Sequence, residues 1–219
     1  VWTDSKKIIK KPRNFNSFKE EIKGKKIKRI WRRGKNIIID LSNDYSLLVH
    51  QKMTGHLLYG TWSIKHGIWE PLEKGPLEEK TNKYIRIMFF LDNKKMLALS
   101  DLRKFAKVEL WKTKDLLNSK EFKSLGPEPL EKGFTFGKFR KFLENKKGKI
   151  KQVLMDQSVV VGIGNIYSSE ALWQANIHPE RSVAKLSEQE LKLIYQAIKK
   201  VLGLGVKLGG ESFSDYRKV

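Results

Sequence analysis

The sequence is defined first by what it lacks. Its 219 residues include no cysteine, and only 24 acidic residues stand against 45 basic ones. The lack of cysteine excludes disulfide bonds and any zinc or iron–sulfur site that needs cysteine ligands. The sequence also has no apolar run long enough to cross a bilayer and no signal-peptide pattern. We therefore expect a cytoplasmic chain that has no membrane partner and binds no metal or cofactor of its own.

The shortage of acidic residues leaves a formal net charge of +21, with a sequence pI near 10.0. Such a surplus favours polyanionic partners and accelerates the encounter with them. Solubility alone is the competing explanation. Many of the basic residues, however, stand beside aromatic residues and glycine turns rather than in a charged tail. Nucleic acid is the polyanion that this pattern favours.

The first half of the chain has the alternation and the β-branched residues typical of strands. Strands are predicted at 26–31, 36–41, 46–50, 84–91, 95–100 and 107–111, and a short helix is predicted at 15–23. Residues 92–94, Asp-Asn-Lys, have hairpin chemistry. Residues 62–83 contain Gly, Pro and Glu, and we expect them to form a loop.

Helical periodicity begins after the Leu-Gly-Pro-Glu-Pro-Leu segment at 125–130. Phe136, Phe139, Phe142 and Leu143 are expected to share one helix face. A later helix follows Ser187-Glu188-Gln189-Glu190, which resembles a capping box. The predicted order is a β domain at 1–124, a Pro/Gly linker at 125–133 and a helical domain at 134–219.

Gly162-Ile163-Gly164-Asn165 is the most informative turn in the sequence. A helical pattern follows it, so backbone N–H groups and the Asn165 amide would face outward at a helix N-terminus, where phosphate binds well. A dinucleotide motif is disfavoured, because Tyr167 replaces the third glycine. A tight turn without a ligand is an equal alternative for the motif alone, and Lys149 and Lys151 favour phosphate.

Other candidate residues follow predicted strands. Lys35 lies where a strand restarts, which makes it a candidate phosphate ligand, whereas a solvated hairpin tip is a strong alternative for the arginines at 32–33. Met53, Arg103 and Phe105 lie in short turns. A lone Met or Phe usually belongs to the core. Together on a basic protein, these residue types can wedge between bases and fill the space left by an extruded base.

These residues carry a resemblance to the bacterial formamidopyrimidine-DNA glycosylases, a family that also includes endonuclease VIII. The matching motifs occur in the family's order along nearly the whole chain. They are Arg-Arg-Gly-Lys at 32–35, His-x-x-Met-x-Gly at 50–55, Asp-x-Arg-Lys-Phe at 101–105, Leu-Gly-Pro-Glu-Pro-Leu at 125–130, Gly-x-Gly-Asn-Ile-Tyr at 162–167, Ile-His-Pro-Glu-Arg at 177–181 and Gly-Gly at 209–210.

The resemblance implies an α+β fold, in which an antiparallel β-sandwich is followed by a helical domain with a helix–two-turn–helix motif. It implies that DNA lies between the two domains. It also implies base-excision repair of double-stranded DNA. Family members excise oxidised purines, such as 8-oxoguanine and formamidopyrimidine, and then cleave the abasic strand by β,δ-elimination.

The resemblance also assigns roles to single residues. Those that match the phosphate contacts around the lesion are Lys35, His50, Lys151 and Asn165. Those that match the set filling the void after base flipping are Met53, Arg103, which would face the orphaned cytosine, and Phe105, which would wedge the neighbouring step. Those that match the start of the loop over the everted base are Gly210, Glu211, Ser212 and Tyr216.

The sequence departs from the family in several places. Family enzymes begin with Pro-Glu, in which the proline amine is the nucleophile and the Glu is the acid/base, whereas this chain begins Val1-Trp2. The cysteine-ligated zinc finger of the full-length family member has no counterpart here. Ala106 replaces a common glycine, and Glu211 replaces a small hydroxyl residue. We expect a fragment of a bifunctional glycosylase and lyase, with no normal lyase activity by itself.

Two other functions are considered. One is a non-catalytic relative that binds damaged DNA, and the other is an RNA-associated protein, because the helix–two-turn–helix also occurs in a ribosomal protein. The Met–Arg–Phe set argues against the second, since a ribosomal protein needs no intercalating plug. We expect a monomer in the bacterial cytoplasm that associates with the nucleoid when bound to DNA.

Overall fold

The computed structural model describes residues 1–209, and the chain divides into two compact units, Val1–Ser119 and a second that begins at Lys120. The division falls just before the Pro/Gly segment, and the domain limits drawn from the sequence stay a prediction. In the described residues, no helix is both long enough and apolar enough to span a membrane.

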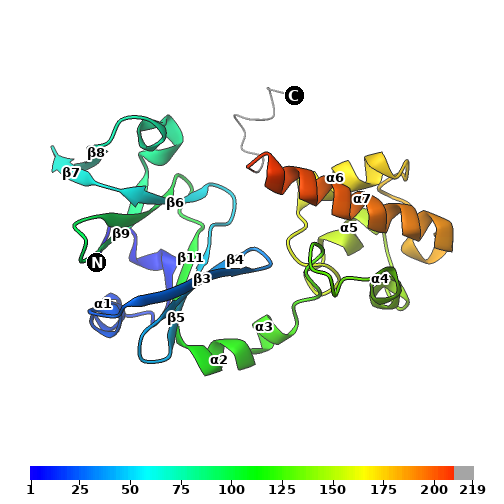
Figure 1. Cartoon of the computed structure of the whole chain (residues 1–219), viewed down its shortest axis with the longest axis horizontal. Helices are drawn as coiled ribbons and strands as arrows, with labels where there is room; N and C mark the ends of the chain where they lie inside the picture. Colours follow the sequence, from blue (N-terminus) through cyan, green and yellow to red (C-terminus); the bar gives the residue numbers. More distant parts are fainter. Residues whose placement is uncertain (210–219) are drawn as a thin grey trace. The chain divides into compact units, whose positions relative to one another are not determined.

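Two main sheets form the first unit (Figure 1). Their strands are β1 (Trp2–Thr3), β2 (Ile9–Lys11), β3 (Ile27–Arg33), β4 (Asn36–Leu41), β5 (Tyr45–His50), β6 (Gly55–Gly60), β9 (Ile85–Phe90), β10 (Met96–Asp101) and β11 (Lys107–Lys112). One sheet has the order β1-β9-β10-β6 and the other β2-β11-β5-β4-β3. The neighbouring strands are antiparallel, apart from the parallel pair β2 and β11.

The two sheets share one apolar core, which makes the unit a sandwich. Leu47 and Val49 of β5 meet Ile87 of β9 and Leu99 of β10 in a single buried cluster. Alternate residues of these strands point to the same side, because side chains in a strand alternate between its two faces. Helix α1 (Phe15–Ile22) adds the buried Phe18, and Asn14 caps its first turn. The predicted β-sandwich is confirmed.

The expected loop at 62–83 is wrong. A hairpin occupies its first part, with β7 (Trp62–Lys65) paired to β8 (Ile68–Pro71), and the short 3-10 turns η2 (Pro76–Glu78) and η3 (Lys80–Asn82) follow. His66 and Gly67 both have positive φ, as a tight hairpin turn requires. Buried Trp62 packs with residues of the first sheet. The loop was predicted from the glycine, proline and glutamate residues of the segment, and these do not report the packing of Trp62.

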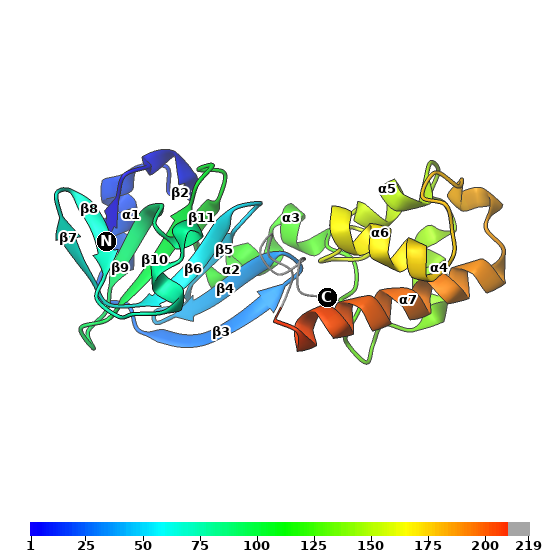
Figure 2. The ribbon, with the colours of Figure 1, turned by 90° about the horizontal axis from the view of Figure 1, so that it is seen from above.

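The second unit is helical (Figure 2). It contains α3 (Lys120–Lys123), α4 (Phe136–Leu143), α5 (Ile150–Met155), α6 (Asn165–Gln174), η4 (Val183–Lys185) and α7 (Glu188–Lys207), while α2 (Thr113–Asn118) ends the first unit. Ser187 and Glu190 form the predicted capping box of α7. Phe139 and Leu143 are buried, but Phe142, expected on the same face, is exposed.

Candidate nucleic-acid interface

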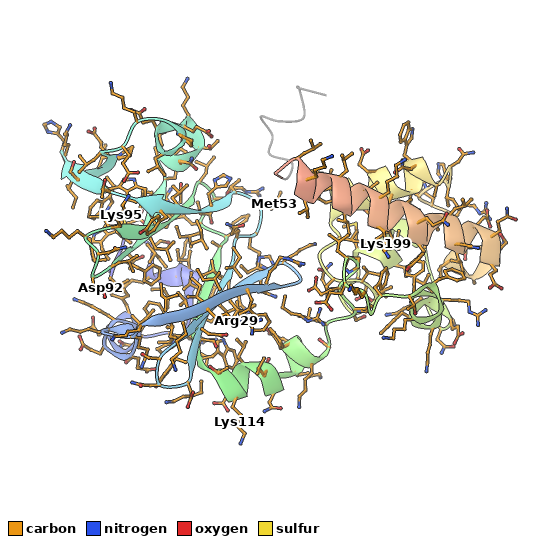
Figure 3. The ribbon with its side chains drawn as sticks, in the orientation of Figure 1. Arg29, Met53, Asp92, Lys95, Lys114 and Lys199 are labelled. Atoms are coloured by element: carbon orange, nitrogen blue, oxygen red, sulfur yellow. The ribbon has the colours of Figure 1, made fainter. Side chains whose placement is uncertain are left out.

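The turn from His50 to Gly55 joins β5 to β6 and carries Met53 at its tip (Figure 3). The Gly55 N–H donates to the Gln51 carbonyl at 3.1 Å, and a Cβ on Gly55 would overlap that carbonyl. This close approach requires glycine at position 55. Met53 is 73% exposed, although methionine residues in folded proteins are usually buried.

A second turn, from Asp101 to Ala106, leaves the end of β10. Lys104 has a φ of +57°, so the backbone doubles back at that residue. Arg103 and Phe105 are both exposed, Phe105 to 52%. The turn therefore presents one cationic and one aromatic side chain to solvent.

The structure brings these three side chains together. The Arg103 Nη1 donates to the Met53 sulfur at 3.2 Å, across a sequence separation of 50 residues. The Arg103 guanidinium carbon also lies 4.6 Å from the centre of the Phe105 ring, a cation–π contact. A flexible thioether, a planar cation and an aromatic ring thus form one exposed group, the wedge set.

Sequence reasoning missed the residue that holds both turns. Asp101 is completely buried, and its Oδ1 accepts from the Thr54 hydroxyl at 2.5 Å and from the Arg103 N–H at 3.2 Å. Its Oδ2 accepts from the Ala106 N–H at 2.8 Å. Asp101 does begin the Asp-x-Arg-Lys-Phe motif. Its link to Thr54 has no signal in the sequence.

Lys35 and His50 lie at turns of the five-stranded sheet. The His50 Nδ1 accepts from the Lys52 N–H at 3.0 Å, so its proton belongs on Nε2, which can donate to an anion. Burial, followed by the charges of Lys52, Lys35 and Lys107, lowers the pKa of His50 to about 4. Burial and Lys52 also lower the pKa of Lys35. Burial is the larger cause of both lowered pKa values, and the neighbouring lysine charges add a repulsion that a bound anion would relieve.

The Gly162–Asn165 turn opens α6, as the sequence predicts. Gly162 has a φ of +86°, Gly164 is the N-cap, and Asn165 is the exposed first residue of the helix. No side chain caps this end, so the first N–H groups of α6 lack the acceptors that a helix interior provides. A helix end without a side-chain cap, together with the helix dipole, is suited to an anion.

The side chain of Gln157 holds this turn in shape, and the sequence gives no separate signal for that role. Its Oε1 accepts from the Gly162 N–H at 3.0 Å. Its Nε2 donates to the carbonyls of Ile163, at 2.9 Å, and Met155, at 2.8 Å. A single amide thus connects the end of α5 to the start of α6.

The two lysines that favour phosphate at this turn differ. Lys149 forms an ion pair with Glu180, which partly neutralises its charge. Lys151 is half-buried and makes no ion pair within residues 1–209. Its backbone N–H donates to the Pro179 carbonyl at 3.2 Å, which fixes the start of α5. Lys151 is therefore the better placed cation for a phosphate.

The structure does not describe four of the predicted site residues. Gly210, Glu211, Ser212 and Tyr216 lie outside the described residues. Ala106, which departs from the family pattern, is buried and donates its N–H to Asp101. Among residues 1–209, no group of three or more His, Asp or Glu side chains is arranged to hold a metal ion.

A β-sandwich that exposes a Met–Arg–Phe set, followed by helices with a turn suited to anions, is typical of a two-part nucleic-acid-binding protein. Comparison with known proteins identifies the family. Residues 1–108 match the formamidopyrimidine-DNA glycosylase N-terminal domain, and residues 125–217 match the formamidopyrimidine-DNA glycosylase H2TH domain. The chain belongs to the formamidopyrimidine-DNA glycosylase family.

Individual relatives agree with this assignment. The formamidopyrimidine-DNA glycosylase of Desulforamulus reducens is 35% identical over 210 residues, which cover 95% of this chain and 70% of the relative. That of Bacillus cereus is also 35% identical, over 96% of this chain and 70% of its own length. The Lactococcus lactis Fpg in complex with abasic-site DNA superposes with a TM-score of 0.81 at 32% identity, covering 97% of this chain and 72% of that one.

Proposed function

We propose that this chain recognises oxidised purines and abasic sites in double-stranded DNA, as part of base-excision repair. Family membership supports the reaction class, since the relatives are DNA glycosylases. The observation that carries the proposal is the contact of Arg103 with both Met53 and Phe105 on an exposed surface. We place this activity in the bacterial cytoplasm, at the DNA.

The wedge set fits the physical demands of base eversion. Extruding a nucleotide leaves an unstacked gap, which apolar and planar side chains can fill. Met53 supplies a flexible apolar group, and Phe105 supplies a ring for the neighbouring step. Arg103 keeps guanidinium N–H donors for the base left without its partner. The preference for the opposite base would therefore depend on Arg103.

Phosphate contacts would hold the backbone around the lesion. We assign this role to the positive region at Lys35 and His50, and to Lys151 and Asn165 at the helical turn. Such contacts position the duplex without reading its sequence. Lys151→Ala should make the slope of log affinity against log salt less negative by about 1. Lys149→Ala is the matched control, with a smaller expected change, because Glu180 already partners Lys149.

The finer enzymology is also a proposal. A full-length parent would be a bifunctional glycosylase and lyase with a zinc finger, as the resemblance implies. The 219 residues begin Val1-Trp2 rather than with the family's Pro-Glu pair, and they contain no cysteine for the finger. We propose that these residues alone bind lesions without forming a Schiff base. Borohydride trapping on an 8-oxoguanine duplex tests this, and a covalent adduct would contradict it.

Binding to a duplex with a tetrahydrofuran abasic analogue tests the function itself. We expect this duplex to bind more tightly than the intact duplex and a structured RNA at matched salt, because its gap is already open. Equal affinity for the damaged and intact duplexes would contradict lesion recognition. Tighter binding to the RNA would instead support the RNA-associated alternative.

A further inference from the structure

We propose that the Asp101 carboxylate and the Thr54 hydroxyl form a latch that positions Met53, Arg103 and Phe105 as one preassembled wedge. Neither latch residue would touch the DNA, so both are positioning residues. The proposal rests on the proposed function for its role in DNA recognition. Its structural part concerns the free protein.

The wedge set needs such a latch because its own contacts are exposed. Met53 and Phe105 are 73% and 52% exposed, and the Arg103 contacts to them compete with water. Cation–π contacts are weak at exposed sites. Ordering these long side chains also reduces their conformational entropy. Surface contacts alone would therefore leave the two turns free to separate.

The latch supplies two hydrogen bonds between the turns, one of which ends on the buried Asp101 carboxylate. The Thr54 hydroxyl, beside Met53, donates to Asp101 Oδ1 at 2.5 Å and accepts from the Arg103 N–H at 3.3 Å. Asp101 also accepts from the N–H groups of Arg103 and Ala106, which lie on either side of Phe105. Hydrogen bonds to a buried charged acceptor are stronger than neutral ones. Thr54 thus links the two turns through its hydroxyl, which bonds both Asp101 and Arg103.

The latch is anchored in the hydrogen-bonded sheet. Asp101 ends β10 and pairs with Gly55, the first residue of β6. Its N–H donates to the Tyr84 carbonyl at 2.9 Å, and its carbonyl accepts from Arg86 Nε at 2.8 Å. The strand pairing therefore positions Asp101, and through it the wedge set. His50 stands at the start of the turn that holds Thr54, so the latch also fixes the spacing between a phosphate contact and the wedge.

Methyl NMR of the free chain tests the structural part. The sequence has four methionines, so the Met53 methyl can be assigned by substitution. Thr54→Val keeps the shape of the side chain and removes the hydroxyl. We expect the Met53 methyl to become more mobile in this variant and to regain its order in Thr54→Ser. Unchanged Met53 mobility in Thr54→Val would overturn the proposal.

Thr61→Val is the matched control. The Thr61 hydroxyl also donates to a carboxylate, that of Glu73, at 3.1 Å, but it lies between β6 and β7, outside the turns of the wedge set. The same loss of a hydroxyl is therefore made away from the latch. We expect no change in Met53 mobility in the control.

Binding to duplexes with the abasic analogue opposite cytosine or adenine tests the functional part. We expect Thr54→Val to reduce the cytosine preference by about fivefold, the equivalent of one hydrogen bond, with little change on intact duplex. Adding Thr54→Val to Arg103→Ala should cause no further loss of preference. The latch would be overturned if Thr61→Val reduced the cytosine preference as much as Thr54→Val does. It would also be overturned if the losses of preference in Thr54→Val and Arg103→Ala simply added in the double variant. A wild-type chain without preference for the abasic duplex would instead overturn the proposed function, and the methyl measurement would still decide the latch.

Discussion

The candidate DNA-contacting turns of the two units are held by different chemistry. In the β unit, a buried carboxylate, Asp101, accepts hydrogen bonds from Thr54, Arg103 and Ala106. In the helical unit, a neutral amide, Gln157, accepts from one backbone N–H and donates to two carbonyls. Each unit thus relies on one organising side chain, and only that of the β unit is a carboxylate.

The difference matches what each turn presents. The β unit presents side chains to the DNA, so its backbone N–H groups are not needed there and can all donate to a strong acceptor such as Asp101. The helical unit presents backbone N–H groups at the start of α6. A carboxylate there would compete with phosphate for the positive end of the helix, whereas an amide leaves that end free. We call Asp101 and Gln157 the organisers of their turns. The comparison predicts that changing Asp101 affects mainly the stability of the β unit, whereas changing Gln157 affects mainly the affinity for DNA.

The largest expected effect follows removal of the charged organiser. Asp101→Ala leaves the buried Ala106 N–H and the Thr54 hydroxyl without their acceptor, and we expect it to lower the free energy of unfolding of the β unit by about 3 kcal/mol. Urea unfolding measures the change. Asp92→Ala, at an exposed hairpin position, is the control and should have little effect. A loss no larger than the control's would show that Asp101 organises nothing.

The next effect concerns the packing behind the helical turn. A Cβ on Gly205 of α7 would come within 2.5 Å of the Tyr167 hydroxyl oxygen, in the first turn of α6. We expect Gly205→Ala to destabilise the helical unit by about 1–3 kcal/mol through overpacking. Gly203→Ala meets no atom within 4 Å and should stabilise α7 by up to about 1 kcal/mol. Thermal unfolding of the two variants measures these changes in stability. A change of the same sign in both variants would contradict the packing account.

Changing the neutral organiser into a charged one tests the comparison directly. Gln157→Glu loses the two amide N–H donors and places a negative charge beside the turn for which we propose phosphate binding. We expect affinity to fall by about tenfold for damaged and intact duplexes alike. Gln174→Glu, at the far end of α6, makes the same charge change as a control. A selective loss on damaged duplexes would contradict the assignment of this turn to phosphate.

The smallest effect concerns His50. Its pKa of about 4 in the folded chain lies below the ordinary value, so the unfolded chain binds protons more readily between about pH 4 and 6.5. The contribution of His50 to stability is therefore present above that window and is lost as pH falls through it. Lys52→Gln should raise the pKa of His50, because it removes a nearby positive charge. NMR titration measures this, with the exposed Lys74→Gln as control, and an unchanged or lower pKa would contradict the electrostatic account.

Much of the fold could be predicted from local patterns. Strand alternation predicted most of the sandwich strands, and the capping residues predicted the start of α7. The hairpin at 62–71 was missed, because Trp62 is fixed by packing against strands distant in the sequence. Tertiary contacts of that kind leave no local periodicity.

The candidate site was predicted in part. Residue types pointed to Met53, Arg103 and Phe105, and the structure brings all three together. The organisers Asp101 and Gln157 act through bonds that form only after the chain has folded. The Thr54–Asp101 bond depends on the register that pairs Asp101 with Gly55. A side chain that satisfies several backbone groups cannot be distinguished in a sequence from one that faces solvent.

The central claim is that the wedge set reads the base opposite an extruded nucleotide. Its most direct test is the affinity of Arg103→Ala for abasic-analogue duplexes that differ only in the opposite base. We expect the variant to lose the preference for cytosine while it keeps most of its overall affinity, whereas Lys151→Ala should weaken all duplexes similarly. An Arg103→Ala variant with undiminished preference for cytosine would contradict the claim.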